Sequence, residues 1–144
     1  MLAEILGMEQ RLARAIVWVS GLPPGLSAAW FIDDGGIDQS GLETCLPETE
    51  LTTMSLSENA QDRRHFAMRR SFQRCFTKIA SGWAGKARDL PMRFVRDQRP
   101  VCDAALSLCL SFSSSGPLAI ACAVSGGVGG IDVERVRTVG NALD

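Results

Sequence analysis

The sequence contains a single histidine, His65, and its five cysteines stand apart from one another without a Cys-x-x-Cys pair. A structural zinc site draws four ligands from closely spaced Cys and His residues, so this composition argues against the usual zinc modules. Five scattered cysteines in 144 residues do not suggest a disulfide framework either. We therefore expect buried, reduced thiols at Cys45, Cys75, Cys102, Cys109 and Cys122.

Long apolar runs are also absent. No segment approaches the roughly 18 apolar residues that a membrane-spanning helix needs. The first fifteen residues carry Glu4, Glu9, Arg11 and Arg14 within their apolar pattern and so do not resemble a signal peptide. We expect a cytoplasmic protein that does not enter a membrane. No repeat and no Pro/Gly/Ser-rich linker interrupts the chain, which predicts a single domain over residues 1–144.

Charge is nearly balanced over the whole chain but not along it. Residues 1–62 hold ten acids and two bases, whereas residues 63–99 hold two acids and eleven bases. Residues 100–144 hold four acids and two bases. A basic segment of this density is typical either of a solvated helix face or of a surface that binds an anionic partner.

The strongest helical pattern covers about residues 58–81, where apolar side chains recur at three- and four-residue steps. Ser57, followed by Asn59 and Ala60, offers an N-cap, and Gly82 and Gly85 end the helix. We expect its aromatic stripe to be core and its cations to form a solvated face, with His65 partly exposed. The stripe is Phe72, Phe76 and Trp83, and the cations are Arg69, Arg70 and Lys78.

The remaining pattern is that of short elements. Residues 2–14 predict a helix and residues 15–19 a strand, whereas residues 27–59 have a weak pattern that indicates short helices or loop. Strands are predicted after the long helix, with a hairpin connection at residues 125–127. The expected fold is α+β, with one long basic amphipathic helix packed on a small antiparallel sheet. The late strands are residues 91–96, 106–112, 118–124 and 130–133.

Asp132 and Glu134 stand two residues apart on the last of these strands, so their side chains project from the same face. Paired carboxylates of this kind suit Mg²⁺, which prefers oxygen ligands and completes its shell with water and phosphate oxygens. An ordinary pair of solvent-facing acids at a sheet edge has the same pattern. The residues around the pair distinguish the two interpretations.

Four segments resemble, in order and spacing, those of the two-lobed 4′-phosphopantetheinyl transferases. That family has a basic helix led by Arg-Phe, a Gly-Lys-Pro turn, an Asn-x-Ser-His-Ser strand and a Gly-Ile-Asp-x-Glu strand. The resemblance spans about residues 58–137 and covers the first of the two lobes. The matching segments are the helix from Arg63 to Arg74, the turn Gln98-Arg99-Pro100, the strand Ser111-Phe112-Ser113-Ser114-Ser115 and the strand Gly130-Ile131-Asp132-Val133-Glu134.

The resemblance implies a site for coenzyme A and Mg²⁺. In such enzymes the metal is held against the coenzyme A pyrophosphate while a carrier-protein serine attacks the β-phosphate. By position, the metal ligands are Asp132 and Glu134. The implied coenzyme A residues are Arg64 or His65 at the nucleotide end, Arg99 and Pro100 in the turn, and Ser113, Ser114 and Ser115 on the strand.

Three departures from the family qualify this site. Ser114 stands where the family has a phosphate-binding histidine, Gln98 replaces the glycine of the turn, and the sequence ends at Asp144 before any Trp-x-x-Lys-Glu segment of a second lobe. We therefore expect transfer to an acyl or peptidyl carrier protein only when a partner supplies that lobe, as a separate subunit or in a homodimer. The alternative is a degenerate, non-catalytic module for protein interaction or coenzyme A binding. Nucleic-acid binding rests on charge alone, without a reader motif.

Overall fold

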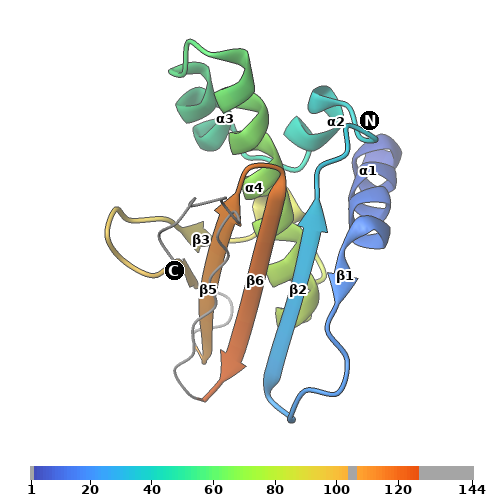
Figure 1. Cartoon of the computed structure of the whole chain (residues 1–144), viewed down its shortest axis with the longest axis vertical. Helices are drawn as coiled ribbons and strands as arrows, with labels where there is room; N and C mark the ends of the chain where they lie inside the picture. Colours follow the sequence, from blue (N-terminus) through green and yellow to red (C-terminus); the bar gives the residue numbers. More distant parts are fainter. Residues whose placement is uncertain (1, 104–106, 127–144) are drawn as a thin grey trace, which may run out of the picture.

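The computed structural model describes residues 2–103 and 107–126, and in it a long helix packs behind an antiparallel sheet (Figure 1). The larger sheet of this described part has the strand order β1-β2-β6-β5, and β3 and β4 form a separate pair. The fold is therefore α+β, as expected. The elements are α1 (Leu2–Ala15), β1 (Val17–Trp18), β2 (Leu26–Ile32), α2 (Gln39–Glu43), α3 (Glu48–Ser55), α4 (Ala60–Ser81), the 3₁₀ turn η1 (Ala87–Asp89), β3 (Met92–Arg93), β4 (Val101–Cys102), β5 (Leu108–Ser115) and β6 (Leu118–Ser125).

Helix α4 confirms the predicted long helix and its C-terminal cap, but it begins at Ala60 with Asn59, not Ser57, as the N-cap. The Asn59 side chain accepts hydrogen bonds from the backbone N–H groups of Gln61 and Asp62, at 2.7 and 3.3 Å. At the other end Gly82 has φ +73°, a conformation that suits glycine, and the next N–H returns to the Lys78 carbonyl at 3.1 Å. The helix therefore ends where the sequence indicates.

Aromatic side chains join α4 to the sheet. Phe72 and Phe76 are fully buried, and Phe72 stacks on Phe31 of β2 with ring centroids 6.1 Å apart. Phe76 stacks on Trp18 at 5.1 Å and meets Phe112 of β5 edge-on at 6.2 Å. Aromatic pairs of this geometry add about 0.5 to 1.5 kcal/mol each to the burial of their area. Strands from both edges of the sheet are thus held to a single helix.

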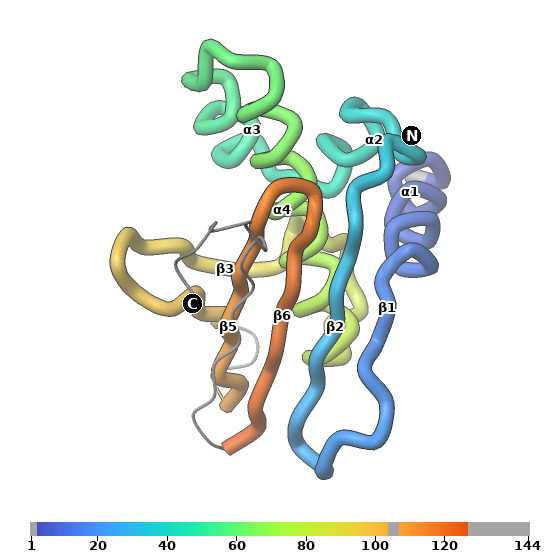
Figure 2. Tube along the Cα trace, in the orientation of Figure 1, coloured from blue at the N-terminus to red at the C-terminus, as the bar shows by residue number. Residues whose placement is uncertain are grey.

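The expectation of short helices or loop over residues 27–59 was wrong for residues 27–32, because they belong to the strand β2. This strand pairs along its whole length with β6, from Leu26 opposite Val124 to Ile32 opposite Leu118. Both of its faces carry mainly apolar side chains, so the sequence lacks the alternation that marks a half-exposed strand. The tube in Figure 2 shows β1 along one side of β2, while the loop between β3 and β4 projects on the opposite side of the sheet.

The later strands differ from their predicted bounds. β3 is shorter than predicted, with only Met92 and Arg93 paired to β4. β5 is displaced toward the C-terminus and includes the whole serine run, and it turns into β6 through Gly116 and Pro117. Gly116 has φ +56°, and the ring of Pro117 requires a negative φ, which together correspond to a type II′ hairpin. The strand predicted at residues 130–133 lies outside the described residues, as does Gly127 of the predicted hairpin connection at residues 125–127.

The expectation of a solvated cationic face on α4 was also wrong, because Arg69, Arg70 and Lys78 are all half-buried. The acidic first segment of the chain supplies carboxylates to this helix. Three close ion pairs cross between the two segments: Arg64 with Asp33 at 2.6 Å, Arg74 with Glu50 at 2.9 Å and Lys78 with Glu9 at 2.6 Å. The uneven charge along the chain is thus partly neutralised within the fold.

The Arg74–Glu50 pair is the most buried of these contacts. Arg74 is 3% exposed and donates from Nε and one terminal nitrogen to the two Glu50 oxygens, at 2.9 and 3.0 Å. Its other terminal nitrogen donates to the carbonyls of Ala87 and Leu90, at 3.2 and 2.7 Å. One side chain of α4 therefore fixes both α3 and the segment that leads into β3.

We predict that Glu50→Gln lowers the free energy of unfolding by about 3 to 5 kcal/mol, because it leaves a buried guanidinium without its counter-charge. Urea unfolding of the purified variant measures this. The control is Asp103→Asn, which breaks the exposed Arg93–Asp103 pair and should change stability much less. Equal losses in the two variants would contradict a special role for the buried pair.

Candidate functional site

The structure describes seven of the nine residues assigned to the site from the sequence. Asp132 and Glu134, the proposed metal ligands, lie outside the described residues. Within residues 2–103 and 107–126, no group of three or more His, Cys, Asp or Glu side chains is arranged to hold a metal ion. The remaining residues divide between the two ends of β5.

Arg64 and His65 lie at the end of the sheet where β5 turns into β6. The Arg64 guanidinium donates to both oxygens of Asp33, at 2.6 and 2.8 Å, and to the Ile37 carbonyl at 2.7 Å. The Asp33 N–H in turn donates to the Pro117 carbonyl at 2.8 Å, which joins this group to the hairpin after the serine run. Arg64 therefore already holds one carboxylate of the chain, and His65 is half-buried beside it on α4.

The hydrogen bonds from Arg64 lower the pKa of the Asp33 carboxyl below its ordinary value of 3.8. Burial opposes this shift, while the Gly35 N–H and the charges of Arg64 and His65 add to it. The Asp33 carboxylate is therefore ionised throughout the neutral range. It acts as an internal anion that positions Arg64.

The serines occupy both faces of β5. The face of the sheet that packs on α4, the inner face, includes Ala121 of the core cluster and Phe112, which packs against that cluster. Ser114 has the same parity as Phe112, whereas Ser113 and Ser115 project from the opposite, outer face. The outer face of β5 is thus a polar stripe of small side chains, namely Cys109, Ser111, Ser113 and Ser115.

Arg99 belongs to this serine stripe. One of its terminal nitrogens lies 3.4 Å from the Cys109 sulfur, at the beginning of β5. Ser113 follows Cys109 by four residues, which corresponds to about 13 Å along a strand. Arg99 therefore lies beside the beginning of β5, whereas Ser113 and Ser115 lie toward the other end of the same outer face.

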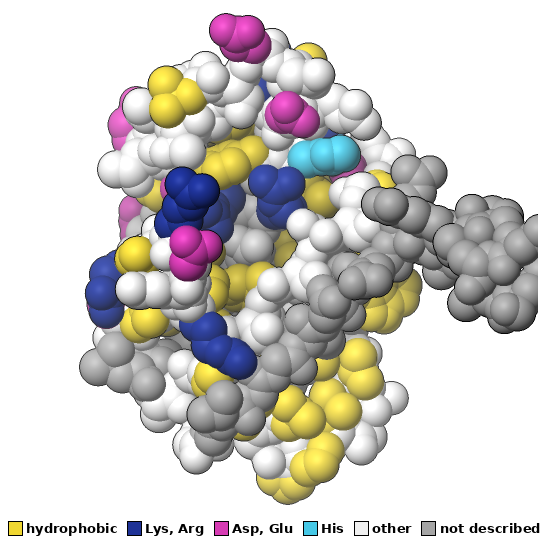
Figure 3. Space-filling view, turned by 60° about the vertical axis from the view of Figure 1, so that its left-hand side comes forward, with side chains coloured by type: hydrophobic (Ala, Val, Ile, Leu, Met, Phe, Trp, Pro, Cys, Tyr) yellow, Lys and Arg dark blue, Asp and Glu magenta, His cyan; other side chains and the backbone are white. Residues whose placement is uncertain are grey.

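Pro100 lines a cleft on the other side of β5. This basic cleft has a volume of about 500 Å³, within the range of small-molecule sites. Figure 3 shows this side of the molecule, where Lys and Arg side chains gather among apolar ones. The lining comes from α4, from the segment between β3 and β4 and from β5, and consists of Arg70, Gln73, Phe94, Val95, Arg96, Gln98, Pro100 and Phe112.

Arg70 is the most unusual group of the basic cleft. Its guanidinium carbon lies 3.6 Å from the Phe94 ring centroid, and one terminal nitrogen lies 3.1 Å from the Gln73 side-chain oxygen. Its Nε is buried and has no hydrogen-bond partner in the described part of the chain. The nearest carboxylate, Glu50, is 4.0 Å away and is already bound by Arg74.

Burial lowers the pKa of the Arg70 guanidinium, although an arginine remains charged at neutral pH. Arg96 adds a second guanidinium to the lining, and the lining residues that the structure describes include no Asp or Glu. The basic cleft therefore carries a surplus of positive charge. A partly desolvated, incompletely paired guanidinium beside an aromatic ring is suited to an anionic ligand.

Sequence reasoning missed Arg70, Gln73 and Arg96 as site residues. Arg70 and Gln73 are three residues apart on a helix and so lie on one face, a signal present in the sequence. Arg96 precedes Arg99 by three residues in the segment that connects β3 to β4. What the sequence does not show is the path that brings this segment against α4.

Comparisons of the chain with protein families, with curated proteins and with solved structures give no match. In the described part of the chain no helix is both long enough and apolar enough to cross a membrane. The cysteines in this part are unpaired thiols, and all except the half-buried Cys109 are buried. A function for the chain is therefore proposed from the residues and geometry of the site.

We predict that the stabilising effect of Asp33 depends on pH. Because its pKa is lowered in the folded protein, its contribution is fully present above the unfolded value near 3.8 and is lost as pH falls through the lower folded value. The stability difference between the wild type and Asp33→Asn should therefore be constant from neutral pH down to about pH 4 and shrink below it. Urea unfolding from pH 2 to pH 7 measures the difference, and a gap that grows with acid would refute the assignment.

Proposed function

We propose that the chain is the coenzyme-A-binding first lobe of a 4′-phosphopantetheinyl-transferase-like protein. In this proposal it presents coenzyme A for Mg²⁺-dependent transfer of 4′-phosphopantetheine to a carrier-protein serine. A second lobe, from another subunit or a second copy of the chain, completes the cleft. The protein acts in the cytoplasm, on a soluble carrier domain.

The observation that carries this proposal is the arrangement of cations and hydroxyls around β5, the outermost strand of its sheet among the described residues. Arg99 lies beside the serine stripe on the outer face, while Arg70 and Arg96 line the basic cleft next to the same strand. Coenzyme A carries several phosphate groups, and guanidinium groups bind phosphate through paired, charge-assisted hydrogen bonds. A ligand that extends across the β5 edge would reach both sets of groups.

Asp132 and Glu134 remain the proposed ligands of Mg²⁺. Carboxylate oxygens are the donors that this cation prefers, and a metal there would neutralise the phosphates that the arginines position. Ser114 stands in place of the family's histidine and offers a neutral hydroxyl to the phosphate. We therefore expect coenzyme A to bind more weakly than in the family, by about tenfold or more if the lost contact is buried.

We predict that coenzyme A binds the full chain in isothermal titration and that Mg²⁺ strengthens the binding. Arg96→Ala and Arg99→Ala should each weaken it about tenfold to a hundredfold, the effect of losing one charge-assisted hydrogen bond. Asp132→Asn should remove the dependence on Mg²⁺. The control is Arg14→Ala, which removes an exposed arginine of α1 distant from the cleft and should leave the affinity unchanged.

Equal weakening in the Arg14→Ala control would mean that the arginine variants act only through the net charge of the protein. The absence of heat with or without Mg²⁺ would reject coenzyme A as the ligand. Transfer is read separately, from the mass of a carrier protein incubated with coenzyme A, Mg²⁺ and this chain. An adduct of phosphopantetheine, alone or after addition of a second-lobe protein, marks an enzyme. Binding without any adduct marks a non-catalytic module.

The alternative function, a protein-interaction module, is favoured by the outer face of the sheet. Beyond the serine stripe this face is apolar: Trp30 is 36% exposed and Ile32 is 49% exposed. The strand register places Ser113, Ile120 and Trp30 in one row, so the polar edge continues directly into apolar surface. A second copy that covered the apolar part would leave β5 accessible.

We predict that the chain forms a dimer through this face and that Trp30→Ser weakens the dimer at least about tenfold, since buried tryptophans dominate interfaces. Sedimentation velocity over a concentration series measures the association. The control is Leu56→Ser, which replaces a 77% exposed leucine after α3. A wild-type monomer at high concentration, or equal effects of the two variants, would overturn the assignment of the interface.

A further inference from the structure

A second hollow lies between α1 and α4, on the flank of α4 opposite to the basic cleft. Arg70 and Gln73 face the cleft, while Cys75, Lys78 and Ile79 line this α1–α4 groove. At about 100° per residue these two sets lie on opposite sides of the helix. The groove has a volume of about 260 Å³ and is also lined by Leu6, Glu9, Gln10 and Ala13 of α1.

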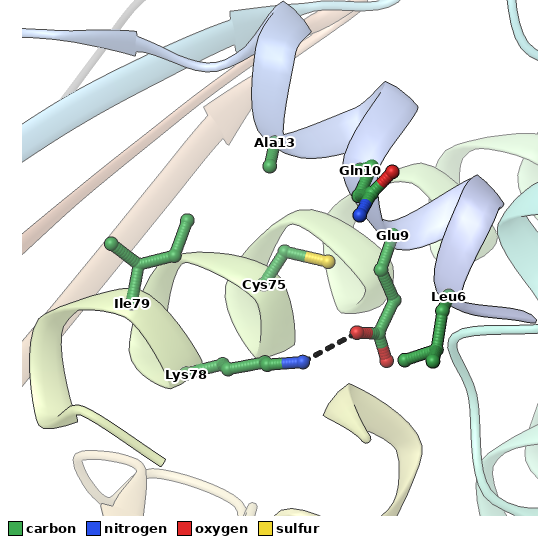
Figure 4. Close-up of a pocket in the computed structure, with 7 residues that line it drawn as sticks. All are labelled: Leu6, Glu9, Gln10, Ala13, Cys75, Lys78 and Ile79. Atoms are coloured by element: carbon green, nitrogen blue, oxygen red, sulfur yellow. Dashed lines mark hydrogen bonds and ion pairs between the residues drawn. The ribbon is translucent and has the colours of Figure 1, made fainter. Parts of the chain in front are cut away.

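The lips of the α1–α4 groove are apolar and exposed. Leu6 of α1 and Ile79 of α4 are 38% and 47% exposed. Ala13 adds a short side chain to the α1 wall, where a longer one would extend into the hollow (Figure 4). Two large apolar side chains around a hollow provide a surface that loses unfavourable contact with water when an apolar molecule enters.

The floor of the groove is polar but neutral. Glu9 is 5% exposed, and its carboxylate accepts one hydrogen bond from the Lys78 ammonium at 2.6 Å and another from the Ala87 N–H. Figure 4 shows Glu9 and Lys78 pointing toward each other below Gln10, with the Cys75 sulfur between the two helices. A hydrogen bond between Cys75 and Cys45 raises the pKa of the Cys75 thiol, and burial raises it further. The sulfur is therefore uncharged at neutral pH.

The net charge of the groove lining indicates that its ligand is uncharged. One carboxylate and one ammonium cancel, so a charged ligand would leave water without gaining a net counter-charge. The Lys78 side chain is 23% exposed, and its ammonium has three N–H donors, of which Glu9 accepts one. The Gln10 amide is a further donor at the rim. Apolar walls with donors at one end match a neutral molecule with a hydrogen-bond acceptor.

We propose that the α1–α4 groove is a binding site for a small, uncharged, mainly apolar molecule that carries a carbonyl oxygen at one end. Its apolar part lies between Leu6 and Ile79, and its carbonyl accepts from Lys78 and Gln10. The volume equals that of about nine water molecules in the liquid, which corresponds to a ligand of fragment size. The site is independent of the basic cleft and of the coenzyme A proposal.

The test compares three six-carbon probes that differ only at the head group: hexanamide, hexanoate and hexylammonium. Each is titrated into the isotopically labelled full chain, and affinities are taken from amide chemical-shift changes. We expect saturable binding of hexanamide with shifts confined to α1 and α4, at least about tenfold tighter than either ion. Ile79→Trp, which fills the groove from its exposed lip, should weaken hexanamide at least about tenfold.

Leu56→Trp serves as the matched control, because it adds the same ring at an exposed position after α3 and should leave hexanamide affinity unchanged. A second groove variant, Ala13→Trp, guards against a change in folding at Ile79. Tighter binding of hexanoate or hexylammonium would overturn the neutral ligand class. Chemical-shift changes that do not saturate and that spread over the whole chain would overturn the site itself. Unchanged hexanamide affinity in both Ile79→Trp and Ala13→Trp would also overturn it.

Discussion

The arrangement of this protein depends on one buried ion pair, Arg74 with Glu50. The Arg74 guanidinium donates from two nitrogens to the Glu50 carboxylate and from the third to the carbonyls of Ala87 and Leu90. It thereby sets the direction in which the chain leaves η1 and enters β3, and so where the segment that lines the basic cleft begins. The pair also explains the state of Arg70. Since Glu50 is committed to Arg74, Arg70 is close to a carboxylate without being neutralised by it, and the cleft keeps its surplus charge.

The separation of acids and bases along the sequence helps the chain to fold as well as to bind a ligand. Carboxylates from α1, from the residue after β2 and from α3 pair with three cations of α4, namely Arg64, Arg74 and Lys78. Buried pairs of this kind contribute little net stability compared with apolar contacts, but a missing partner is costly, so they favour one arrangement of the segments. Two of the remaining cations, Arg70 of α4 and Arg96 of the segment after β3, line the basic cleft. The basic cleft therefore contains cations that these three ion pairs do not use.

Local signals in the sequence were enough to predict α4, its C-terminal cap and the α+β class, because each rests on periodicity or on one capping residue. They failed for β2, which is apolar on both faces and forms a strand only because β6 pairs with it along its whole length. The same limit applies to the site. Arg99 and the serines were identifiable as a linear pattern, whereas Arg70 becomes a site residue only through Phe94, which is distant in sequence. Long-range packing, not residue type, decides which arginine is incompletely paired.

The parity of β5 restricts how a phosphate ligand can meet the serine run. Ser113 and Ser115 share the outer face with the stripe that Arg99 reaches, but Ser114 has the parity of Phe112 and belongs to the inner face. Three consecutive residues of a strand therefore cannot converge on one phosphate from one side. They can contact one ligand only if it extends across the strand edge, which β5 allows because it is the outermost strand of its sheet in the described part of the chain. The basic cleft lies on the inner side of the same edge, so a ligand long enough to extend across it would reach the arginines on both sides.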